Sequence, residues 1–415
     1  MQENKFEGNV FAGLQVVELA AGGPGAYTGK LFADYGAEVI RVEPKEGDPA
    51  RLEKPFVKDT PGIENSLRYH YLNTNKKSVV IDITSPEGKK AFLDLAGTAD
   101  LLIESFPPGY MDSIGLGYGV LSSVKPKIVY TAITPFGQTG LYKDYPFSDL
   151  TLMAMGGMLF LAGTDDDKPA LAPDKQSFFQ ADLYAALASM VALFHADVTS
   201  EGQFIDVSIQ EAVATALENA IQTYDLEGSI RRGSSAVEAG RGVYNCQDGS
   251  VYIMAAMGRN TYLWDPLVEW MMEEKIEGAE ILKGEEWRET EYRTTKEAMT
   301  IFKELFERFA SKYPKLVMYE ESQKRKLALC PINNAKDILE NPQFVFRNFF
   351  KTIYSEPAGS TITMPGAPVY IEKIPWELKN PAPALGQHTY EVLSQLGYSP
   401  DNIKSLVERG VIYVR

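Results

Sequence analysis

Apolar residues recur with two different periods along the chain, which predicts a protein of mixed α and β structure. The longest helical pattern covers 180–196, where apolar side chains recur every three or four residues: Leu183, Leu187, Met190, Val191 and Phe194. A turn at 199–202 follows, and 203–208 then alternate between polar and apolar residues, as a half-buried strand does. We take this helix–turn–strand succession as the centre of the fold.

The first third of the chain repeats a strand–helix–strand pattern. Strands are predicted at 15–19, 38–42, 78–83, 100–106 and 127–134. A glycine-rich turn at 22–25 leads into a helix at 27–35, and a second helix begins after Ser85 with Pro86 in its first turn. Such repeats predict an α/β fold with a doubly wound, Rossmann-like parallel sheet that binds ligands near the carboxyl ends of its strands.

A smaller domain of α+β type is predicted at 228–330. An Asp-Gly hairpin covers 243–254, and a charge-rich helical region runs from 260 to 319. The pattern of the first domain then resumes. We therefore expect a large domain formed by 1–227 and 331–415, interrupted by the small domain.

Composition and charge exclude several classes of function. No apolar run reaches the roughly 18 residues that suggest a membrane span, and the first residues have no signal-peptide core. The net charge of −15 disfavours a nucleic-acid partner. Two cysteines, Cys246 and Cys330, do not make a disulfide framework, and the three histidines lack zinc-site spacing. We expect a cytoplasmic protein with no membrane partner and no metal.

Several motifs, taken in order, identify a family resemblance. They are ADYGAEVIRVE at 33–43, GDPAR at 47–51, SEGQFIDVS at 200–208 and the Gly386-x-His388-Thr389 tail. Together they resemble the family III CoA-transferases over nearly the whole chain, whereas the glycines of 22–25 fit the dinucleotide pattern G-x-G-x-x-G poorly. The resemblance implies coenzyme A, as acyl-CoA, for a substrate. It also implies an interlocked dimer, in which two chains are threaded through one another as linked rings.

The resemblance also implies a set of residues that bind CoA and the acyl group. They are Gly23, Gly25, Pro44, Asn75, Lys76, Lys77, Ser105, Phe106, Pro108, Gly109, Ile114 and Gln138. The lysines suit a phosphate, since ammonium groups in a backbone turn attract anions. Four positions depart from the family pattern, because Ser105 replaces an Asn, Ser113 and Ile114 replace a basic residue and a Met, and Pro44 replaces an Arg of some members. These departures predict weakened or altered CoA binding.

The residue that carries the family's chemistry is missing at its expected position. In the family a catalytic Asp lies about 25 residues before the Gln of the turn, and counting back from Gln203 gives Phe178. The nearest carboxylates are Asp174 and Asp182, of which Asp182 lies one helical turn from Phe178 on a similar face. Asp149 matches an acid near the active site in relatives, and it equally suits the N-cap of a helix at 150–155.

Three hypotheses follow from this vacancy. In active relatives the Asp attacks the acyl-CoA thioester, and Phe178 has no nucleophilic atom. Our preferred interpretation is a non-catalytic subunit paired with a homologous, Asp-bearing subunit, as in the two-gene transferases of anaerobic aromatic degradation, with succinyl-CoA as donor. The second is a self-sufficient homodimer that uses Asp182 or another carboxylate. The third is a CoA-thioester isomerase or a CoA-binding protein.

Overall fold

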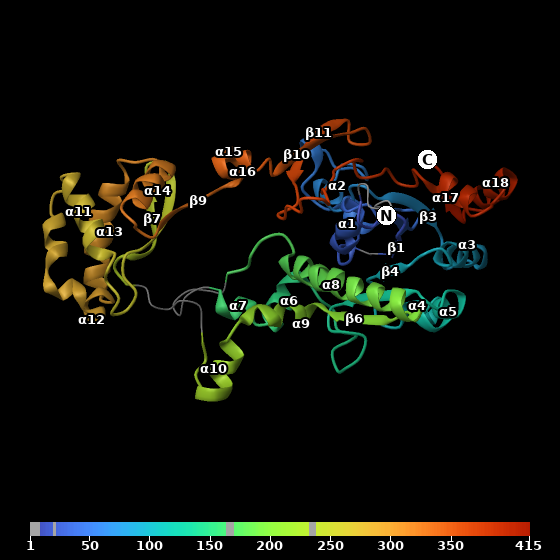
Figure 1. Cartoon of the computed structure of the whole chain (residues 1–415), viewed down its shortest axis with the longest axis horizontal. Helices are drawn as coiled ribbons and strands as arrows, with labels where there is room; N and C mark the ends of the chain where they lie inside the picture. The colour runs from blue at the N-terminus through green and yellow to red at the C-terminus, as the bar shows by residue number, and fades with distance from the viewer. Residues whose placement is uncertain (1–8, 20–21, 163–169, 232–237) are drawn as a thin grey trace, which may run out of the picture. The chain divides into compact units, whose positions relative to one another are not determined.

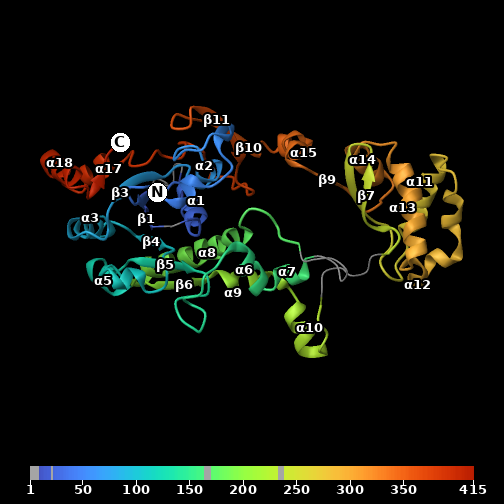
Figure 2. The same ribbon diagram turned by 180° about the vertical axis from the view of Figure 1, so that it is seen from behind.

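The computed structural model describes residues 9–19, 22–162, 170–231 and 238–415, which divide into two compact units (Figures 1 and 2). Unit 1 holds the described residues up to 162 together with 170–231 and 347–415. Unit 2 consists of 238–346. The chain returns to unit 1 at Arg347, later than the boundary expected at 331, because two short helices, α15 (Ala335–Glu340) and α16 (Pro342–Phe346), belong to unit 2.

Unit 1 is built on a seven-stranded sheet. Its order is β12 (Ile412–Tyr413), β3 (Lys77–Ile81), β2 (Glu38–Glu43), β1 (Gln15–Leu19), β4 (Leu101–Glu104), β5 (Val129–Thr134) and β6 (Phe204–Ser208). Only β12 runs antiparallel to its neighbour. The order 3-2-1-4-5-6 is that of doubly wound nucleotide-binding folds, so the predicted parallel sheet is present. From β1 the chain adds strands first on one side, as β2 and β3, and then on the other side, as β4, β5 and β6.

Helices cover both faces of this sheet, as the alternation of side chains along each strand requires. The helices of unit 1 are α1 (Ala26–Asp34), α2 (Leu67–Leu72), α3 (Pro86–Ala96), α4 (Tyr110–Ser113), α5 (Tyr118–Val124), α6 (Asp149–Met155), α7 (Met158–Leu161), α8 (Gln176–Thr199), α9 (Ile209–Ala214), α10 (Ala220–Glu227), α17 (Thr389–Gln395) and α18 (Pro400–Glu408). Val16 faces a core under α1 and α8, and Val17 faces the core under α3 and α18. Ser85 caps α3 as predicted, since its hydroxyl accepts from the Gly88 amide.

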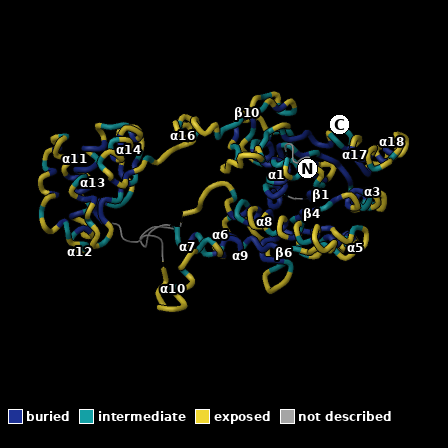
Figure 3. Tube along the Cα trace, viewed as in Figure 1, coloured by how far each residue is buried: buried dark blue, intermediate teal, exposed yellow. Residues whose placement is uncertain are grey.

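The central helix α8 uses a different face from the one its sequence pattern indicates. Its small residues face the sheet and are buried: Ala181, Ala185, Ser189, Ala192 and Ala196. The large apolar side chains of the predicted stripe are exposed instead, for example Leu187 at 55% and Phe194 at 72% (Figure 3). By length and composition alone α8 is long and apolar enough to cross a membrane, a test that mostly buried core helices also pass. Its buried face packs on β5 and α1, as that of a core helix does.

The tail of the chain closes the sheet at its β3 edge. The Val80 amide donates to Thr389 Oγ1 at 3.0 Å, and the Ser78 amide donates to His388 Nδ1 at 3.2 Å. Strand β12 then pairs with β3 through Ile412 and Tyr413. A small hairpin of β10 (Phe350–Ser355) and β11 (Ser360–Pro365) precedes this docking. The Gly-x-His-Thr motif therefore anchors the returning chain to the first domain.

Unit 2 has its own sheet and its own core. It contains β7 (Arg241–Cys246), β8 (Gly249–Met254), β9 (Leu329–Ile332), α11 (Trp264–Glu273), α12 (Thr290–Arg293), α13 (Lys296–Ala310) and α14 (Lys315–Lys324). The three strands are antiparallel, and the hairpin predicted at 243–254 is formed by β7 and β8. Trp264, Trp270 and Trp287 are fully buried together. The described part of the unit is thus an α+β body with its own core.

Candidate active site

The candidate site lies at the carboxyl ends of the paired strands β1 and β4, on either side of which the sheet grows in opposite directions. Ligands of doubly wound folds bind at this switch point, and the glycine-rich turn follows β1 in sequence. Gly23 has φ +133° and Gly25 has φ +91°, backbone conformations that side chains disfavour. Asp48 holds the turn in place, since its Oδ2 accepts a hydrogen bond from the Gly22 amide at 3.1 Å.

Helix α8 starts at this turn and is capped by a residue from another helix. Asp149 Oδ1 accepts from the Ser177 amide at 3.0 Å and from the Ser177 hydroxyl at 2.6 Å. The N-cap of α6 is Ser148, which forms a capping box with Thr151. The alternative prediction, that Asp149 caps its own helix, is therefore wrong. The carboxylate of Asp149 instead fixes the residue directly before Phe178.

Phe178 fills the position where the family's catalytic aspartate is expected. Its side chain is 5% exposed, and a Cβ added to Gly23 would lie 3.2 Å from Cδ2 of its ring. Phe147 packs edge-on against the same ring at 6.4 Å, and Lys175 Nζ lies 5.7 Å from the ring centroid. The turn is therefore closed on this side by an apolar side chain that has no nucleophilic atom.

Asp182, one helical turn further on, is buried against the start of α1. The Gly25 amide donates to its Oδ1 at 2.7 Å, and the Tyr27 amide donates to its Oδ2 at 3.0 Å. Burial raises the pKa of Asp182 to about 7, although the two amides counter this effect. Only 1% of the residue is exposed. Both carboxylate oxygens are used to satisfy the free N–H groups at the amino end of α1.

A buried ion network supports the turn from within the sheet. Arg41 pairs with Glu18 and, at 2.8 Å, with Asp48 Oδ2. Lys76 Nζ contacts Glu18 Oε2 at 2.8 Å and the Ala26 carbonyl at 2.7 Å, and burial lowers the pKa of Lys76 to about 8. The ammonium group predicted to bind a phosphate is thus used inside the fold.

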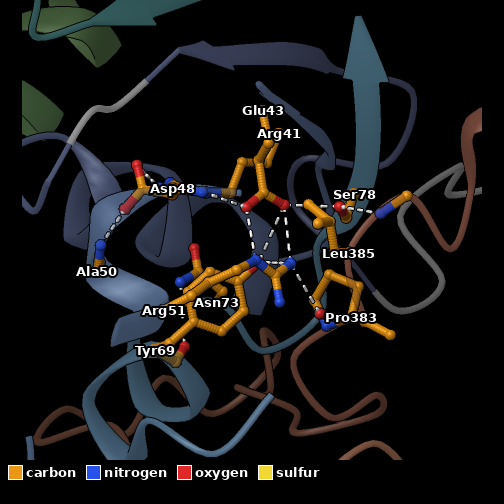
Figure 4. Close-up of polar contacts among 12 residues, drawn as sticks. Arg41, Glu43, Asp48, Ala50, Arg51, Tyr69, Asn73, Ser78, Pro383 and Leu385 are labelled. Carbon is orange, nitrogen blue, oxygen red and sulfur yellow. Dashed lines mark hydrogen bonds and ion pairs between the residues drawn. The ribbon is translucent and has the colours of Figure 1, made fainter. Parts of the chain in front are cut away.

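The same network connects the first domain to the returning tail (Figure 4). Arg51 donates through Nε to Glu43 Oε2 at 2.6 Å and through Nη2 to the Pro383 carbonyl at 3.2 Å. Ser78 donates to Glu43 Oε1 at 2.6 Å. Arg51 also lies over the ring of Tyr69, 3.9 Å from its centroid. The VIRVE and GDPAR motifs therefore supply the interior charges of the fold.

Asn75 and Lys77 lie away from the glycine-rich turn, at the amino end of β3. Asn75 is bound by the tail, since its Oδ1 accepts from the Asn380 amide at 2.8 Å. Lys77 Nζ lies 2.6 Å from Glu38 Oε1 and 2.8 Å from Glu391 Oε1. Both residues line a cavity of about 400 Å³ together with His388 and Arg415. In a parallel sheet this edge is opposite the carboxyl ends, so the predicted CoA residues do not form one cluster.

The residues that follow β4 do lie at the carboxyl edge, around a buried acid. Ser105, Phe106, Pro108 and Gly109 form the turn after β4, and Ile114 ends α4 and packs on the core beneath. Glu104 is 4% exposed and accepts from the Phe106 amide at 2.6 Å. Burial raises the pKa of Glu104 to about 7, with further contributions from Asp112 and Asp206. A phosphate at this turn would face carboxylates.

The two remaining predicted residues lie on exposed connections. Pro44 follows β2 and is exposed. Gln138 follows β5, and its amide donates to both oxygens of Asp206 at 3.1 and 3.0 Å. Its Nε2 has no hydrogen-bond partner in the described part of the chain. Pro44 and Ser113, where relatives place cations, supply no positive charge on this edge.

Three residues of the site were not predicted from sequence: Glu104, Asp112 and Asp206. Glu104 ends an apolar strand pattern, in IES at 103–105, and a carboxylate there was the available signal. Asp206 gave no such signal, because it is exposed and fits the alternation of its strand. Among the described residues no group of three His, Cys, Asp or Glu side chains is arranged to hold a metal.

Comparison with known proteins gives consistent matches. The model of CoA-transferase family III matches residues 11–389. The chain is 42% identical to the succinyl-CoA:(R)-benzylsuccinate CoA-transferase subunit BbsE of Thauera aromatica, over 98% of this chain and 99% of that protein. It is 29% identical to the succinyl-CoA–L-malate CoA-transferase alpha subunit of Chloroflexus aurantiacus, over 97% of this chain and 92% of that protein.

Solved structures resemble the whole chain as well. A CAIB/BAIF family protein from Brucella suis superposes with a TM-score of 0.82 at 26% identity, covering 94% of this chain and 100% of that one. A protein from Mycobacterium tuberculosis superposes with a TM-score of 0.74 at 22% identity, covering 92% of this chain and 99% of that one, a likeness of fold.

Proposed function

The chain belongs to CoA-transferase family III, and on that premise we propose that it is the non-catalytic subunit of a two-chain CoA-transferase. Its homologous partner carries the aspartate. The enzyme moves CoA from succinyl-CoA to a carboxylic acid of the class of (R)-benzylsuccinate, in the cytoplasm. The named substrate of the relative at 42% identity supports this choice of donor and acceptor.

One observation carries this proposal: Phe178, the residue that the sequence count places at the family's nucleophile, is buried and packed. The ring lies against Gly23 and Phe147 and is 5% exposed, so the position is filled, not merely neutral. A carboxylate is required to attack the thioester carbonyl, giving a mixed anhydride and CoA thiolate. A phenyl ring supports no such step.

In the proposed enzyme the chemistry takes place on the partner. An aspartate of the partner subunit is acylated by succinyl-CoA, and the thiolate then attacks the anhydride to give aspartyl-CoA and free succinate. The incoming carboxylate attacks that thioester, which releases CoA thiolate and leaves a mixed anhydride of the aspartate and the new acyl group. The thiolate then attacks the acyl carbonyl of this anhydride, giving the new acyl-CoA and the free aspartate. This chain contributes the second ring of an interlocked pair, which the fold of the catalytic chain requires for assembly.

Asp182 is the nucleophile of the competing homodimer hypothesis. Its two oxygens accept from Gly25 and Tyr27, and an acyl group on either oxygen would break the cap of α1. The site around β4 also holds Glu104, Asp112 and Asp206, whose carboxylates repel a phosphate. These features support a structural role for Asp182, and they argue against a CoA-binding protein or CoA-thioester isomerase built on this chain alone.

The test is CoA transfer from succinyl-CoA to a panel of aromatic and aliphatic carboxylates. The assay uses this chain alone, then together with a homologous chain that has aspartate at the position of Phe178. Each mixture is treated with hydroxylamine, which traps acylated carboxylates, and the two chains are analysed separately by mass spectrometry. Asp182→Asn in this chain and the matching Asp→Asn change in the partner serve as paired variants.

We expect turnover only with the partner present and hydroxylamine adducts only on the partner. The partner's Asp→Asn change abolishes turnover, whereas Asp182→Asn leaves turnover per folded complex within about twofold. Turnover by this chain alone, with an adduct on one of its carboxylates, would overturn the proposal and identify the nucleophile.

A further inference from the structure

A cavity of about 400 Å³ lies at the amino end of β3, where the returning tail docks on the sheet. Three segments of unit 1 form its walls: residues 75–77, the turn at 356–357 between β10 and β11, and the tail at 380–388 with Arg415. Since ligands of a doubly wound sheet bind at the carboxyl ends of its strands, this cavity lies at the opposite edge from the candidate active site. The proposed reaction leaves it without a role.

Two side chains of the tail turn their hydrogen-bond acceptors into the fold. His388 Nδ1 accepts from the Ser78 amide at 3.2 Å, and Gln387 Oε1 accepts from the Ala384 amide at 2.9 Å. The proton of a neutral His388 is therefore on Nε2, because a ring nitrogen that accepts carries no hydrogen. Burial lowers the pKa of His388, which keeps the ring neutral near pH 7. What each of the two side chains has left for a ligand is an N–H donor, at its Nε2 atom.

A lysine and an arginine add cationic donors to the same cavity. Lys77 Nζ gives one N–H to Glu38 at 2.6 Å and one to Glu391 at 2.8 Å, so the third N–H of the ammonium remains. The Arg415 guanidinium is exposed and lies 3.4 Å from Glu64, a contact that uses few of its five N–H groups. On a chain of net charge −15, a cavity lined by these donors is a local site for an anion.

Much of the remaining wall is apolar. Its carbon surface comes from Pro357, Pro381, Pro383 and Ala384. Glu356 is the acid among the lining residues, and it is exposed, so its carboxylate can turn to water. A bare inorganic anion would leave the proline wall unused, whereas an organic acid covers it with its carbon chain. The lining therefore favours a carboxylate that carries a small apolar body.

We propose that this cavity binds a small organic acid of the size of succinate, with a carboxylate on the N–H donors described above and its carbon chain on the prolines. The inference goes beyond the proposed function, because this ligand is bound and is not converted. Lys77 belongs to β3 and the other donors belong to the tail, so an occupied cavity connects the two. Binding stabilises the docked tail by mass action, and the docking then depends on the concentration of the acid.

The test follows hydrogen exchange of this chain by mass spectrometry, within its complex with the Asp-bearing chain used above. Peptides that cover 75–81 and 380–389 of this chain are compared with and without succinate. Succinamide has the same carbon chain without the charges, and inorganic phosphate has the charge without the carbon chain. Peptides of the two chains are distinguished by mass, so succinate bound at the active site of the partner is followed on other peptides.

We expect succinate to protect both segments, phosphate to protect them less, and succinamide to protect neither. Absence of protection by succinate would overturn the inference, and so would equal protection by succinamide. Protection by phosphate as strong as that by succinate would return the cavity to the phosphate predicted from sequence and overturn the assignment to an organic acid. These comparisons use the wild type alone, so they are decisive even if a variant fails to fold.

Two pairs of variants then locate the ligand. Gln387→Glu keeps the oxygen that accepts from Ala384 and replaces the donor with a carboxylate oxygen, so it is expected to weaken succinate binding about tenfold. Its control, Gln343→Glu, adds the same charge at an exposed position of unit 2. Arg415→Gln removes an exposed cation paired with a glutamate and is expected to weaken binding about threefold, whereas Arg409→Gln does the same on α18 without effect.

The concentration of succinate that gives half-maximal protection is the measured quantity in these variants. Equal values for Gln387→Glu and Gln343→Glu would show that succinate binds elsewhere and would overturn the inference. The measurement needs no turnover, so its outcome is independent of which chain carries the nucleophile. Turnover and labelling of this chain alone contradict the proposed function, whatever the exchange experiment shows.

Discussion

At the scale of single residues, Phe178 is well accommodated at the position where the family resemblance leads us to expect an aspartate. Phe178 is not a hydrophobic residue exposed in an empty cleft, because it packs on Gly23 and beside Phe147. The adjacent Phe179 is only partly buried and packs edge-on against Tyr27 at 5.0 Å. The two neighbours therefore make a matched pair for measuring what the ring at 178 contributes.

Phe178→Ala is expected to lower the free energy of unfolding by about 3–5 kcal/mol, since it removes a buried ring and leaves a cavity. Phe179→Ala is expected to cost less than half as much. Urea unfolding of both variants measures the difference, and equal losses would show that Phe178 is not tightly packed. The turnover of the complex, corrected for folded protein, is expected to be unchanged in Phe178→Ala, because the ring touches no reacting atom in the proposed enzyme.

Glu104 gives stability a dependence on pH. Its pKa is raised to about 7 in the folded protein from an ordinary value of 4.5, chiefly by burial. Between these values the folded state binds more protons than the unfolded state. The stabilisation that the raised pKa of Glu104 gives the wild type over Glu104→Gln is therefore fully present below about pH 4.5. It is lost as the pH rises toward 7.

The expected loss is on the order of 2 kcal/mol between pH 4.5 and pH 7.5. It is measured as the difference in unfolding free energy between the wild type and Glu104→Gln at each pH. Glu46→Gln changes an exposed acid and is expected to give a difference that does not vary with pH. A constant difference for Glu104→Gln as well would mean that Glu104 is ionised throughout this range.

At the scale of elements, the sequence predicts strands and helices well where local signals decide them. The strand expected at 127–134 is observed at Val129–Thr134, and the helix expected at 27–35 is observed at Ala26–Asp34. Ser85 and Pro86 start α3 where predicted, since a cap and its first turn are neighbours in sequence. The repeated strand–helix–strand units predict a parallel sheet, and the strands β1 to β6 form one.

What the sequence does not reveal depends on contacts between distant residues. The large apolar residues of α8 recur at helical spacing, but alanines occupy the buried face because the helix lies close to the sheet. Lys76 was assigned to a phosphate, but Glu18 takes its ammonium group at 2.8 Å across 58 positions of sequence. The periodicity of a single helix does not show which of its faces will be buried. The sequence near a charged side chain does not show which of two possible partners it will bind.

The cap of α8 by Asp149 illustrates the same point and is open to test. Asp149→Ala removes the oxygen, Oδ1, that accepts from both the amide and the hydroxyl of Ser177, and it is expected to cost about 1–2 kcal/mol of stability. Asp149→Asn retains one acceptor and is expected to cost less. Chemical denaturation gives the totals, and amide hydrogen exchange is expected to increase mainly in the first turn of α8.

The control for this cap is Asp144→Ala, an exposed acid paired only with its neighbour Lys143. Its cost is expected to be within about 0.5 kcal/mol of zero. If Asp149→Ala were as neutral as Asp144→Ala, the amino end of α8 would be held by its packing, and Asp149 would again be a candidate for a role toward substrate.

At the scale of the whole molecule, unit 1 buries a core on both faces of its sheet, yet large apolar side chains of α8 such as Leu187 and Phe194 are exposed. The net charge of −15 gives two copies of this chain a repulsive interaction at long range. Under the proposed function, in which an Asp-bearing partner supplies the nucleophile, this chain acts only as part of a complex.

The division into two units makes a final prediction, because the core cluster of unit 2 consists of residues of that unit. Trp264 and Trp287 stack at 5.5 Å, and the buried pair of Arg293 and Glu238 closes one end of that core. An excised segment of 238–346 is therefore expected to fold alone, with cooperative urea unfolding and the blue-shifted fluorescence of buried tryptophans. The remaining tryptophan of the chain, Trp376, lies in unit 1, so the signal of the intact chain can be compared directly. A segment with solvent-exposed fluorescence and no transition would show that unit 2 needs the rest of the chain to fold.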